Sequence, residues 1–165
     1  MSAASVVVAL AAGFSLLQPT SAEAAPVYWT FRNLTVGNDD QCLTGGKIND
    51  RGTSSVFLTT CNGSNYQQWD WRGTDTVDPS YLQLQNKATG LCLATDNKSF
   101  HNNAVWASTC DWRDGMRFHY EASTHLNLIC SLLPSPSVCL TGRESGAVYS
   151  DVDTDIYAQW RGSHN

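Results

Sequence analysis

The chain has 165 residues, enough for one domain of ordinary size. It carries ten Lys and Arg against fifteen Asp and Glu, a formal net charge of -5, and the basic residues are scattered along it. Nucleic acids and acidic membrane surfaces are bound through patches of Lys and Arg, so neither is expected as a partner.

The N-terminal segment has the pattern of a secretory signal peptide. An apolar run at residues 6–17 is too short to span a bilayer. Small residues follow it at Ala22 and Ala24, where a signal peptidase would need them, although no Lys or Arg precedes the run. We therefore predict a signal peptide over residues 1–24 and a secreted, extracellular domain over residues 25–165. No later stretch is apolar enough for membrane insertion.

A short apolar segment opens the predicted mature chain. Val27, Tyr28 and Trp29 precede Phe31, where the first repeat begins. One interpretation is a first strand that closes the domain. The alternative is an exposed arm that docks onto a partner protein by adding a strand to its sheet.

The rest of the chain repeats one pattern three times. A Cys-Leu pair occurs at Cys42, again 50 residues later at Cys92, and again 47 residues later at Cys139. A period of 40 to 50 residues is typical of closed repeat architectures. The repeats cover about residues 30–75, 79–121 and 124–162.

Each repeat predicts four short strands. Apolar residues two apart mark the first strand, the Cys-Leu pair starts the second, a Val starts the third, and a large aromatic residue ends the fourth. The predicted first strands are 31–34, 81–84 and 125–128, and the third strands are 56–60, 105–109 and 148–150. No helical periodicity is present. We therefore expect an all-β fold with pseudo-threefold symmetry, in which Trp69, Phe118 and Trp160 are equivalent core residues.

Six cysteines in an exported domain predict three disulfides and no metal site. Cys42 and Cys61 are 19 residues apart, and Cys92 and Cys110 occupy equivalent positions 18 apart. Each of these repeats should close its own loop, which leaves Cys130 to pair with Cys139.

The triplet that closes the first repeat, Gln67-Gln68-Trp69, adds a more specific signal. Together with the three Cys-Leu pairs, it resembles the ricin B-type lectin family over about residues 30–162. The resemblance implies a β-trefoil fold. The other two triplets depart from the pattern, because Met116 and Ala158 replace the glutamine.

The resemblance also implies where a sugar would bind. Family members place an acid two residues after the first cysteine of a repeat, an aromatic ring two residues before the second cysteine, and amides at and just before the triplet glutamine. Here the acid positions hold Thr44, Ala94 and Thr141, and the ring positions of the first two repeats hold Thr59 and Ser108. No pocket is complete, so the family's usual sugar binding is not expected.

A sugar site at a shifted position is the alternative. The second repeat is rich in polar and aromatic residues, and Gln67 survives in the first; the candidate ligand-binding residues are Gln67, Asp96, Asn97, Asn102, Trp106 and Trp112. Each also has a structural interpretation: Gln67 holds the turn of its triplet, Trp106 packs in a strand, and Trp112 anchors a loop.

The sequence contains no convincing motif for metal binding or catalysis. Asp151, Asp153 and Asp155 resemble the start of a calcium loop, but the glycine and the closing glutamate of such a loop are missing, so a solvated acidic loop is expected. The four histidines have no metal-binding spacing, and no nucleophile motif is present. We predict no metal, no cofactor and no enzymatic activity.

The sequence thus supports two main functional hypotheses. The first is a secreted, non-catalytic adaptor or subunit that binds another secreted protein, for example in a bacterial toxin complex, with Val27, Tyr28 and Trp29 as the docking segment. The alternative is a lectin that binds glycans through a non-standard pocket. An inhibitor or the targeting subunit of a toxin would have the same fold and no site that a sequence motif identifies.

Overall fold

The structure is a computed structural model that describes residues 25–37, 40–96, 98–123, 127–131 and 137–164. The predicted signal peptide and the candidate residue Asn97 lie outside the described residues. Within those ranges, no helix has the length and apolar character needed to cross a membrane.

The described chain contains twelve strands, four in each predicted repeat, and three single-turn 3₁₀ helices. The first repeat contains β1 (Tyr28–Asn33), β2 (Gln41–Gly45), β3 (Ser54–Thr60), η1 (Asn65–Gln67) and β4 (Trp69–Arg72). The second contains β5 (Gln83–Asn86), β6 (Cys92–Thr95), β7 (Asn103–Ser108), η2 (Asp114–Met116) and β8 (Phe118–Ala122). The third contains β9 (Asn127–Ser131), β10 (Val138–Gly142), β11 (Val148–Asp151), η3 (Ile156–Ala158) and β12 (Trp160–His164). The predicted all-β architecture of three units is confirmed.

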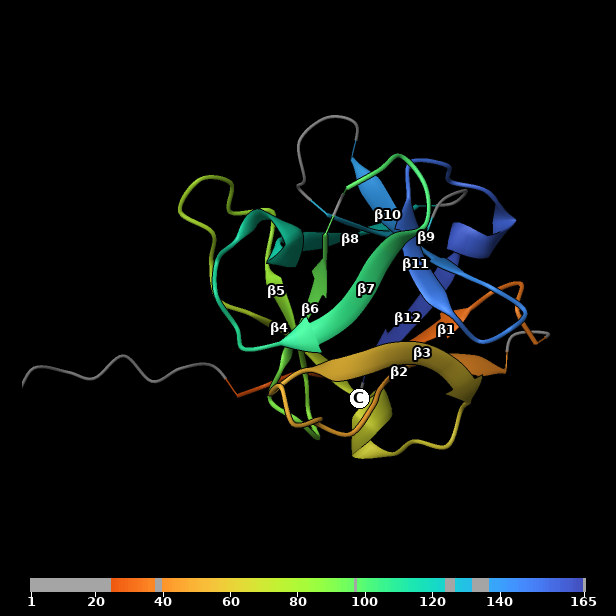
Figure 1. Cartoon of the computed structure of the whole chain (residues 1–165), viewed down its shortest axis with the longest axis horizontal. Helices are drawn as coiled ribbons and strands as arrows, with labels where there is room; N and C mark the ends of the chain where they lie inside the picture. Colours follow the sequence, from red (N-terminus) through yellow and green to blue (C-terminus); the bar gives the residue numbers. More distant parts are fainter. Residues whose placement is uncertain (1–24, 38–39, 97, 124–126, 132–136, 165) are drawn as a thin grey trace, which may run out of the picture.

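Three hairpins cover one end of the molecule. Each joins the second and third strands of a repeat: β2–β3, β6–β7 and β10–β11. Strand β7 pairs with both β3 and β11, so the three third strands surround the centre of the view in Figure 1. The first and fourth strands lie beneath, where β1 pairs with β4 and β12 and β8 pairs with β9.

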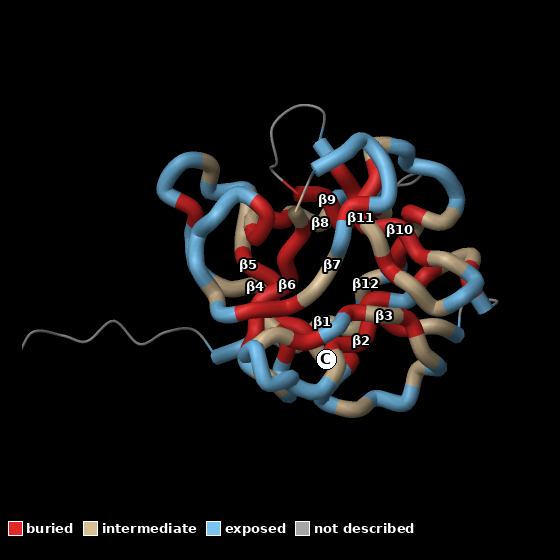
Figure 2. Tube along the Cα trace, viewed as in Figure 1, coloured by how far each residue is buried: buried red, intermediate tan, exposed pale blue. Residues whose placement is uncertain are grey.

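The core is built from equivalent residues of the three repeats. Trp69, Phe118 and Trp160 are completely buried. The indole Nε1 of Trp69 donates to the carbonyl of Leu43 at 2.9 Å, and that of Trp160 donates to the carbonyl of Leu140 at the same distance. Figure 2 shows the strands buried inside and the connecting loops exposed. Each buried indole therefore ties its fourth strand to the second strand of its own repeat.

Two kinds of predicted strand boundary are wrong, and in each a turn comes immediately before the strand. The core aromatic residues begin the fourth strands instead of ending them, because a 3₁₀ turn comes just before each one. The first strand of the second repeat begins at Gln83, two residues later than predicted. There the carboxylate of Asp78 accepts hydrogen bonds from the backbone and hydroxyl of Ser80, which holds residues 78–81 in a turn.

The N-terminal segment belongs to the sheet. Trp29 pairs with His164 in β12 and with Trp69 in β4, and Tyr28 pairs with Asp70. The first-strand interpretation is therefore confirmed. The backbone of Trp29 is paired on both edges and that of Tyr28 on one, which leaves little backbone for a partner strand. Only Val27 of the three lies before the strand, with 46% of its surface exposed.

All three predicted disulfides are confirmed: Cys42–Cys61, Cys92–Cys110 and Cys130–Cys139. Each of the first two joins the second strand of a repeat to the residues just after its third strand, and so closes one hairpin. In the third repeat Cys130 and Cys139 pair directly across β9 and β10.

His119 in β8 makes stability depend on pH. Its ring is half buried against Tyr81, with ring centroids 4.7 Å apart. Burial lowers the pKa of His119 below its ordinary value near 6.5, although Glu121, Asp78 and the backbone of Cys130 oppose the shift. Between the lowered pKa and the ordinary one, the unfolded chain binds more protons than the folded chain.

We therefore expect stability to fall as the pH drops below about 6.5. Chemical denaturation of the wild type and of His119→Phe, which retains a ring against Tyr81, tests this. The wild-type midpoint should fall more steeply between neutral pH and the lowered pKa. Parallel curves for the two proteins would contradict the assignment to His119.

Candidate functional site

Gln67 has a structural role in the first repeat. Its side chain is completely buried. The carbonyl Oε1 accepts hydrogen bonds from the backbone N–H groups of Asn62 and Gly63 at 2.7 and 3.2 Å. The amide Nε2 donates to the hydroxyl of Thr44 at 3.3 Å and to the carbonyl of Thr60 at 3.0 Å. With its amide committed to four internal partners, Gln67 holds the end of the hairpin.

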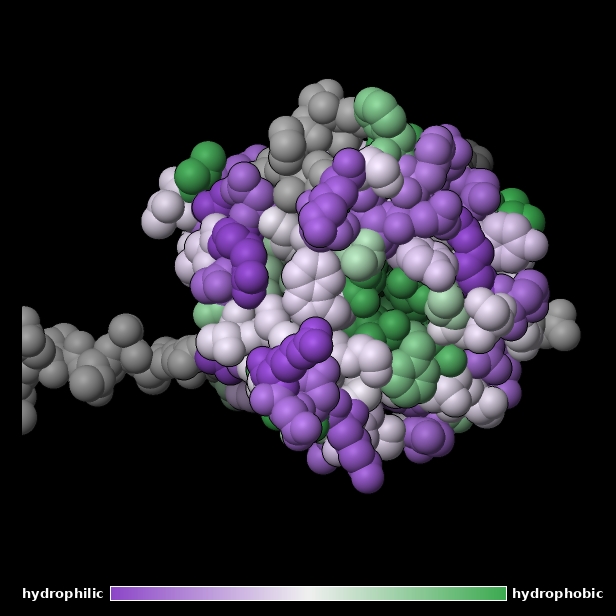
Figure 3. Space-filling model, in the orientation of Figure 1, coloured by the Kyte–Doolittle hydropathy of each residue, from purple (hydrophilic) through white to green (hydrophobic). Residues whose placement is uncertain are grey.

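Every repeat carries an aromatic ring directly opposite the position of the family's acid. The strand register pairs Thr44 with Phe57, Ala94 with Trp106, and Thr141 with Tyr149. The three rings are all partly exposed. Figure 3 shows the end of the molecule that carries these hairpins, with a hollow at its centre whose floor is apolar and whose rim is largely polar.

Trp106 is among the predicted ligand-binding residues, but Phe57 is not, because the family's spacing places the ring two residues before the second cysteine. Side chains two residues apart point to the same face of a strand. The observed rings at Phe57 and Trp106 therefore lie on the expected face, two residues nearer the hairpin tip. A detectable signal was present, since each third strand contains a Val followed by an aromatic residue.

The second repeat has an acid displaced in the same direction. Asp96 lies two residues beyond the expected position at Ala94, immediately after β6. Its Oδ1 accepts a hydrogen bond of 3.1 Å from the backbone N–H of Ala104, and its Oδ2 is 3.3 Å from the ammonium of Lys98. Asp96 is thus fixed across the tip of the hairpin that carries Trp106.

Apolar residues pack beneath Trp106. The ring is packed against a buried cluster formed by Cys92, Ala94 and Met116. Met116 replaces the triplet glutamine, so a hydrophobic side chain supports the ring where the first repeat has the amide of Gln67. Gly115 lets η2 approach closely, because a Cβ there would lie 1.9 Å from the carbonyl oxygen of Thr95.

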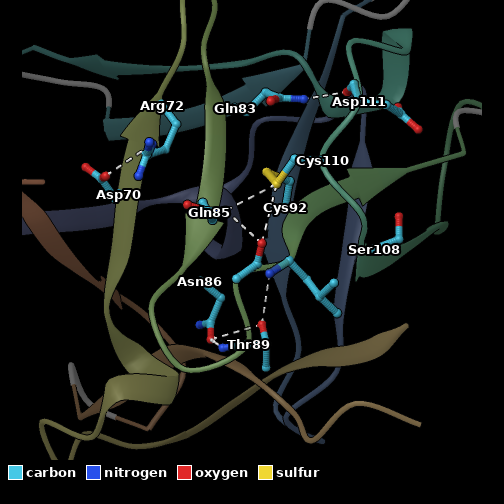
Figure 4. Close-up of a disulfide and its surroundings, with 12 residues drawn as sticks. Asp70, Arg72, Gln83, Gln85, Asn86, Thr89, Cys92, Ser108, Cys110 and Asp111 are labelled. Carbon is cyan, nitrogen blue, oxygen red and sulfur yellow. Dashed lines mark hydrogen bonds and ion pairs between the residues drawn. A yellow bond between two sulfur atoms is a disulfide. The ribbon is translucent and has the colours of Figure 1, made fainter. Parts of the chain in front are cut away.

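A disulfide and several amides tie the base of this hairpin to the neighbouring strand. Figure 4 shows Cys92–Cys110 between Gln85 of β5 and the hairpin that ends at Ser108. Gln85 Nε2 donates to the carbonyl of Gly90 at 2.7 Å and approaches the sulfur of Cys110 at 3.5 Å. Ser108, at the family's ring position, accepts a 3.0 Å hydrogen bond from Arg113. These contacts hold the hairpin in place before any ligand binds.

The first repeat has a groove of about 240 Å³ at the equivalent place. Phe57 and Tyr66 supply two aromatic rings, and Lys47, Asn62 and Ser64 supply polar groups. The groove has no carboxylate among its lining residues, because Thr44 occupies the acid position. It can stack against a ring, but it lacks a charged acceptor.

In the third repeat an ion pair occupies the corresponding space. The guanidinium of Arg143 lies 5.7 Å from the ring centroid of Tyr149. Its Nη2 donates to Asp151 Oδ2 at 2.7 Å and to Asn102 Oδ1 at 3.2 Å. Asn102, the last residue of the loop between β6 and β7, therefore binds Arg143 and Asp151 of the third repeat.

The acidic segment of the third repeat is solvated, as the sequence predicted, only beyond Asp151, which ends β11. Asp151 is buried against Arg143, and Asp155 accepts a 2.9 Å hydrogen bond from the backbone of Tyr157 at the start of η3. Asp153 and Asp155 are both exposed, and Asp153 lies 3.5 Å from His101. Across the described residues, no three metal-ligand side chains come together.

Trp112 lies against the loop after β4, as its loop-anchor interpretation predicts. A Cβ on Gly73 would be 2.5 Å from the indole, and Gly73 has a φ of +75°. Of the candidate ligand-binding residues that the structure describes, Asp96, Asn102 and Trp106 belong to the β6–β7 hairpin, whereas Gln67 and Trp112 lie outside it.

The two equivalent threonines provide a matched test of this geometry. Thr44 donates to the carbonyl of Cys42 at 2.8 Å and accepts from Gln67, whereas the buried hydroxyl of Thr141 has no partner. We expect Thr141→Val to raise the free energy of unfolding by about 1 kcal/mol and Thr44→Val to lower it by about 1 kcal/mol. Urea denaturation measures both; a shift in the same direction for the two variants would contradict the assignment.

Comparison with known proteins identifies the architecture. No family model matches the chain, and no curated protein matches it significantly in sequence. Solved structures do match. The designed threefold-symmetric protein ThreeFoil superposes with a TM-score of 0.65 and 16% identity, over 82% of this chain and 96% of its own. The fold is a β-trefoil. The predicted resemblance to the ricin B-type lectins is thereby confirmed at the level of fold.

Two further solved structures match, one a lectin and the other a much longer toxin. The β-trefoil lectin of the Vibrio vulnificus hemolysin/cytolysin, solved with N-acetyl-D-lactosamine bound, has a TM-score of 0.65 and 17% identity, over 86% of this chain and 97% of that one. A mosquitocidal holotoxin has a TM-score of 0.68 and 15% identity, and the match covers 87% of this chain but 18% of the holotoxin. At these identities the likeness concerns the fold alone.

Proposed function

We propose that this protein is a secreted, non-catalytic lectin that binds carbohydrate at the tip of hairpin β6–β7. One observation carries the proposal: the acid and the ring that the family's pocket requires both occur in the second repeat, each moved two residues toward the hairpin tip. Asp96 supplies the carboxylate and Trp106 the ring. Secretion is supported by the predicted signal peptide and by the three disulfides.

The chemistry of the site suits a sugar. A pyranose has an apolar C–H face and a rim of hydroxyls. The indole of Trp106 offers a flat apolar surface for the first, and Asp96 offers acceptors for the second. Lys98 and the N–H of Ala104 hold the carboxylate in position, which reduces the conformational entropy lost on binding. Nothing in this arrangement acts on a bond of the ligand.

The test is sugar binding by variants of the two residues. We expect Asp96→Asn and Trp106→Ala each to weaken binding about tenfold, equivalent to roughly 1.4 kcal/mol, because one loses a charged acceptor and the other the stacking surface. A glycan array with the mature chain selects the sugar, and isothermal titration measures its affinity.

Asp111→Asn and Ile156→Ala are matched controls, since both change exposed residues outside the β6–β7 hairpin. They should bind like the wild type. An array with no reproducible signal, or equal affinities for all four variants, would exclude this site.

The adaptor hypothesis remains a second proposal. It is supported by the holotoxin, of which a β-trefoil of this size forms only a small part. Its proposed docking segment is reduced to Val27, because the following residues are paired in the sheet. A blank glycan array together with one stoichiometric protein co-purifying from the native secretion would favour it over the lectin.

A further inference from the structure

Two cavities meet at a pair of tryptophans far from the hairpin tips. One has a volume of about 450 Å³ and the other about 300 Å³, and Trp29 and Trp71 line both. They lie where β1 begins and β4 ends. No residue of the hairpin site at Asp96 and Trp106 takes part in either.

The two rings are held rigidly. Trp29 stacks parallel to Phe31 at 6.0 Å between ring centroids, and Trp71 meets Phe31 edge-on at 5.9 Å. Tyr120 and His164 pack against Trp29 from the other sides. A ligand that stacks here would therefore find the rings already oriented.

Their indole N–H groups are available as donors. The buried tryptophans Trp69 and Trp160 each donate a hydrogen bond from Nε1 to a backbone carbonyl. The Nε1 groups of Trp29 and Trp71 make no hydrogen bond to any part of the chain that the structure describes, and neither is among its buried unpaired atoms. Each ring thus presents an apolar surface together with a polar donor.

The polar groups around the rings balance in charge. Asp70 and Arg72 of β4 form an ion pair of 3.7 Å beside the larger cavity, where Thr74 adds a hydroxyl. His119 lines the smaller cavity and is neutral at pH 7, because burial lowers its pKa. The side chains carry no net charge, and Ala25, the first residue of the predicted mature chain, also lines the larger cavity and would add its α-amino group as a donor. Mixed donors and acceptors of this kind match the hydroxyls of a neutral sugar better than a purely apolar ligand.

We infer that the groove around Trp29 and Trp71 is a second carbohydrate-binding site, which takes a neutral oligosaccharide. The ligand class rests on the proposed function, whereas the groove and its open donors do not. Two sites on separate parts of one β-trefoil, one on a hairpin and one at the start of β1, would let a single chain cross-link glycans.

Nuclear magnetic resonance of the indole N–H groups tests both sites in one titration. The chain has six tryptophans, hence six indole signals. The mature protein, labelled with ¹⁵N, is titrated with N-acetyl-D-lactosamine and with neutral β-glucan, chitin and mannan oligosaccharides at millimolar concentration. We expect the signals of Trp29 and Trp71 to shift together, while those of Trp69 and Trp160 stay in place as internal controls.

The Trp106 signal reports the hairpin site independently. If it shifts while Trp29 and Trp71 remain still with every oligosaccharide, the second site is overturned and the proposed function stands. If Trp29 and Trp71 shift and Trp106 does not, the second site stands and the hairpin site fails.

A steric variant separates binding from folding. Thr74 is exposed at the rim of the larger cavity, so Thr74→Trp should fill the space without disturbing the core. In the background Asp96→Asn/Trp106→Ala, we expect this change to weaken the remaining sugar binding at least tenfold with an unchanged melting temperature. Trp71→Leu should give the same loss of binding. Undiminished binding by Thr74→Trp would overturn the inference, even if Trp71→Leu failed to fold.

Discussion

Replacing Arg117 with Met is expected to lower the free energy of unfolding by about 3 kcal/mol, which is typical of a buried ion pair that loses one partner. The Nε of Arg117 lies 2.9 Å from Oδ2 of Asp75, whose side chain is 1% exposed. The N–H is not aligned as a hydrogen bond, so the contact is chiefly ionic. Without Arg117, the carboxylate of Asp75 would remain buried and uncompensated.

The same arginine joins two loops. Its Nη1 is 2.6 Å from Oδ1 of Asp114 in η2, while Asp75 belongs to the loop that leads from the first repeat to the second. Losing Arg117 should therefore loosen the loop between β4 and β5 before the core opens. Hydrogen exchange in that loop should rise in the variant.

Arg113→Met is the matched control. Arg113 pairs with Asp111 at 2.9 Å and donates to Ser108 at 3.0 Å, but its side chain is half exposed, so the variant should lose about 1 kcal/mol, well below the loss for Arg117→Met. The double variant Asp75→Leu/Arg117→Met removes both buried charges and should recover part of the loss. Equal stabilities of Arg117→Met and Arg113→Met in urea denaturation would show that the buried ion pair contributes no more to the free energy of unfolding than the exposed one.

The architecture could be predicted because local patterns recur in sequence. Cys42 and Cys61 repeat as Cys92 and Cys110, and this equivalence gave the disulfides without any knowledge of the fold. A large aromatic residue recurs after each third strand, and all three of these residues are buried in the core. The β-branched and aromatic residues that favour strands lie in the same places in every repeat.

The site could be predicted only in part, because it depends on register. The spacing of the family's pocket assigned the ring to Ser108, and only the pairing of Ala94 with Trp106 shows the displacement toward the tip. The Trp29–Trp71 groove draws on β1, β4 and β8, and no local motif connects them. The partnership of Arg117 with Asp75 likewise joins residues far apart in the chain.

Gln67→Met provides the sharpest test of whether the surviving triplet marks a ligand site or the frame. Met116 occupies the same position in the second repeat, so the side chain fits a β-trefoil of this kind. In the first repeat, however, the change removes the partners of two backbone N–H groups, one carbonyl and one hydroxyl. We expect a loss of about 3 kcal/mol in the free energy of unfolding.

Gln68→Met is the control within the same triplet. Gln68 makes its side-chain hydrogen bonds at the surface, to the carbonyl of Gly63 and from Lys87, so the variant should lose less than about 1 kcal/mol. Sugar binding should be unchanged in both variants, since neither residue lies near Asp96 or Trp106 in the hairpin register. If Gln67→Met abolished sugar binding while keeping wild-type stability, Gln67 would be a ligand and the binding site would belong to the first repeat. If Gln67→Met lost stability and still bound sugar, Gln67 would stabilise the fold, and the sugar-binding site would be assigned to the second repeat.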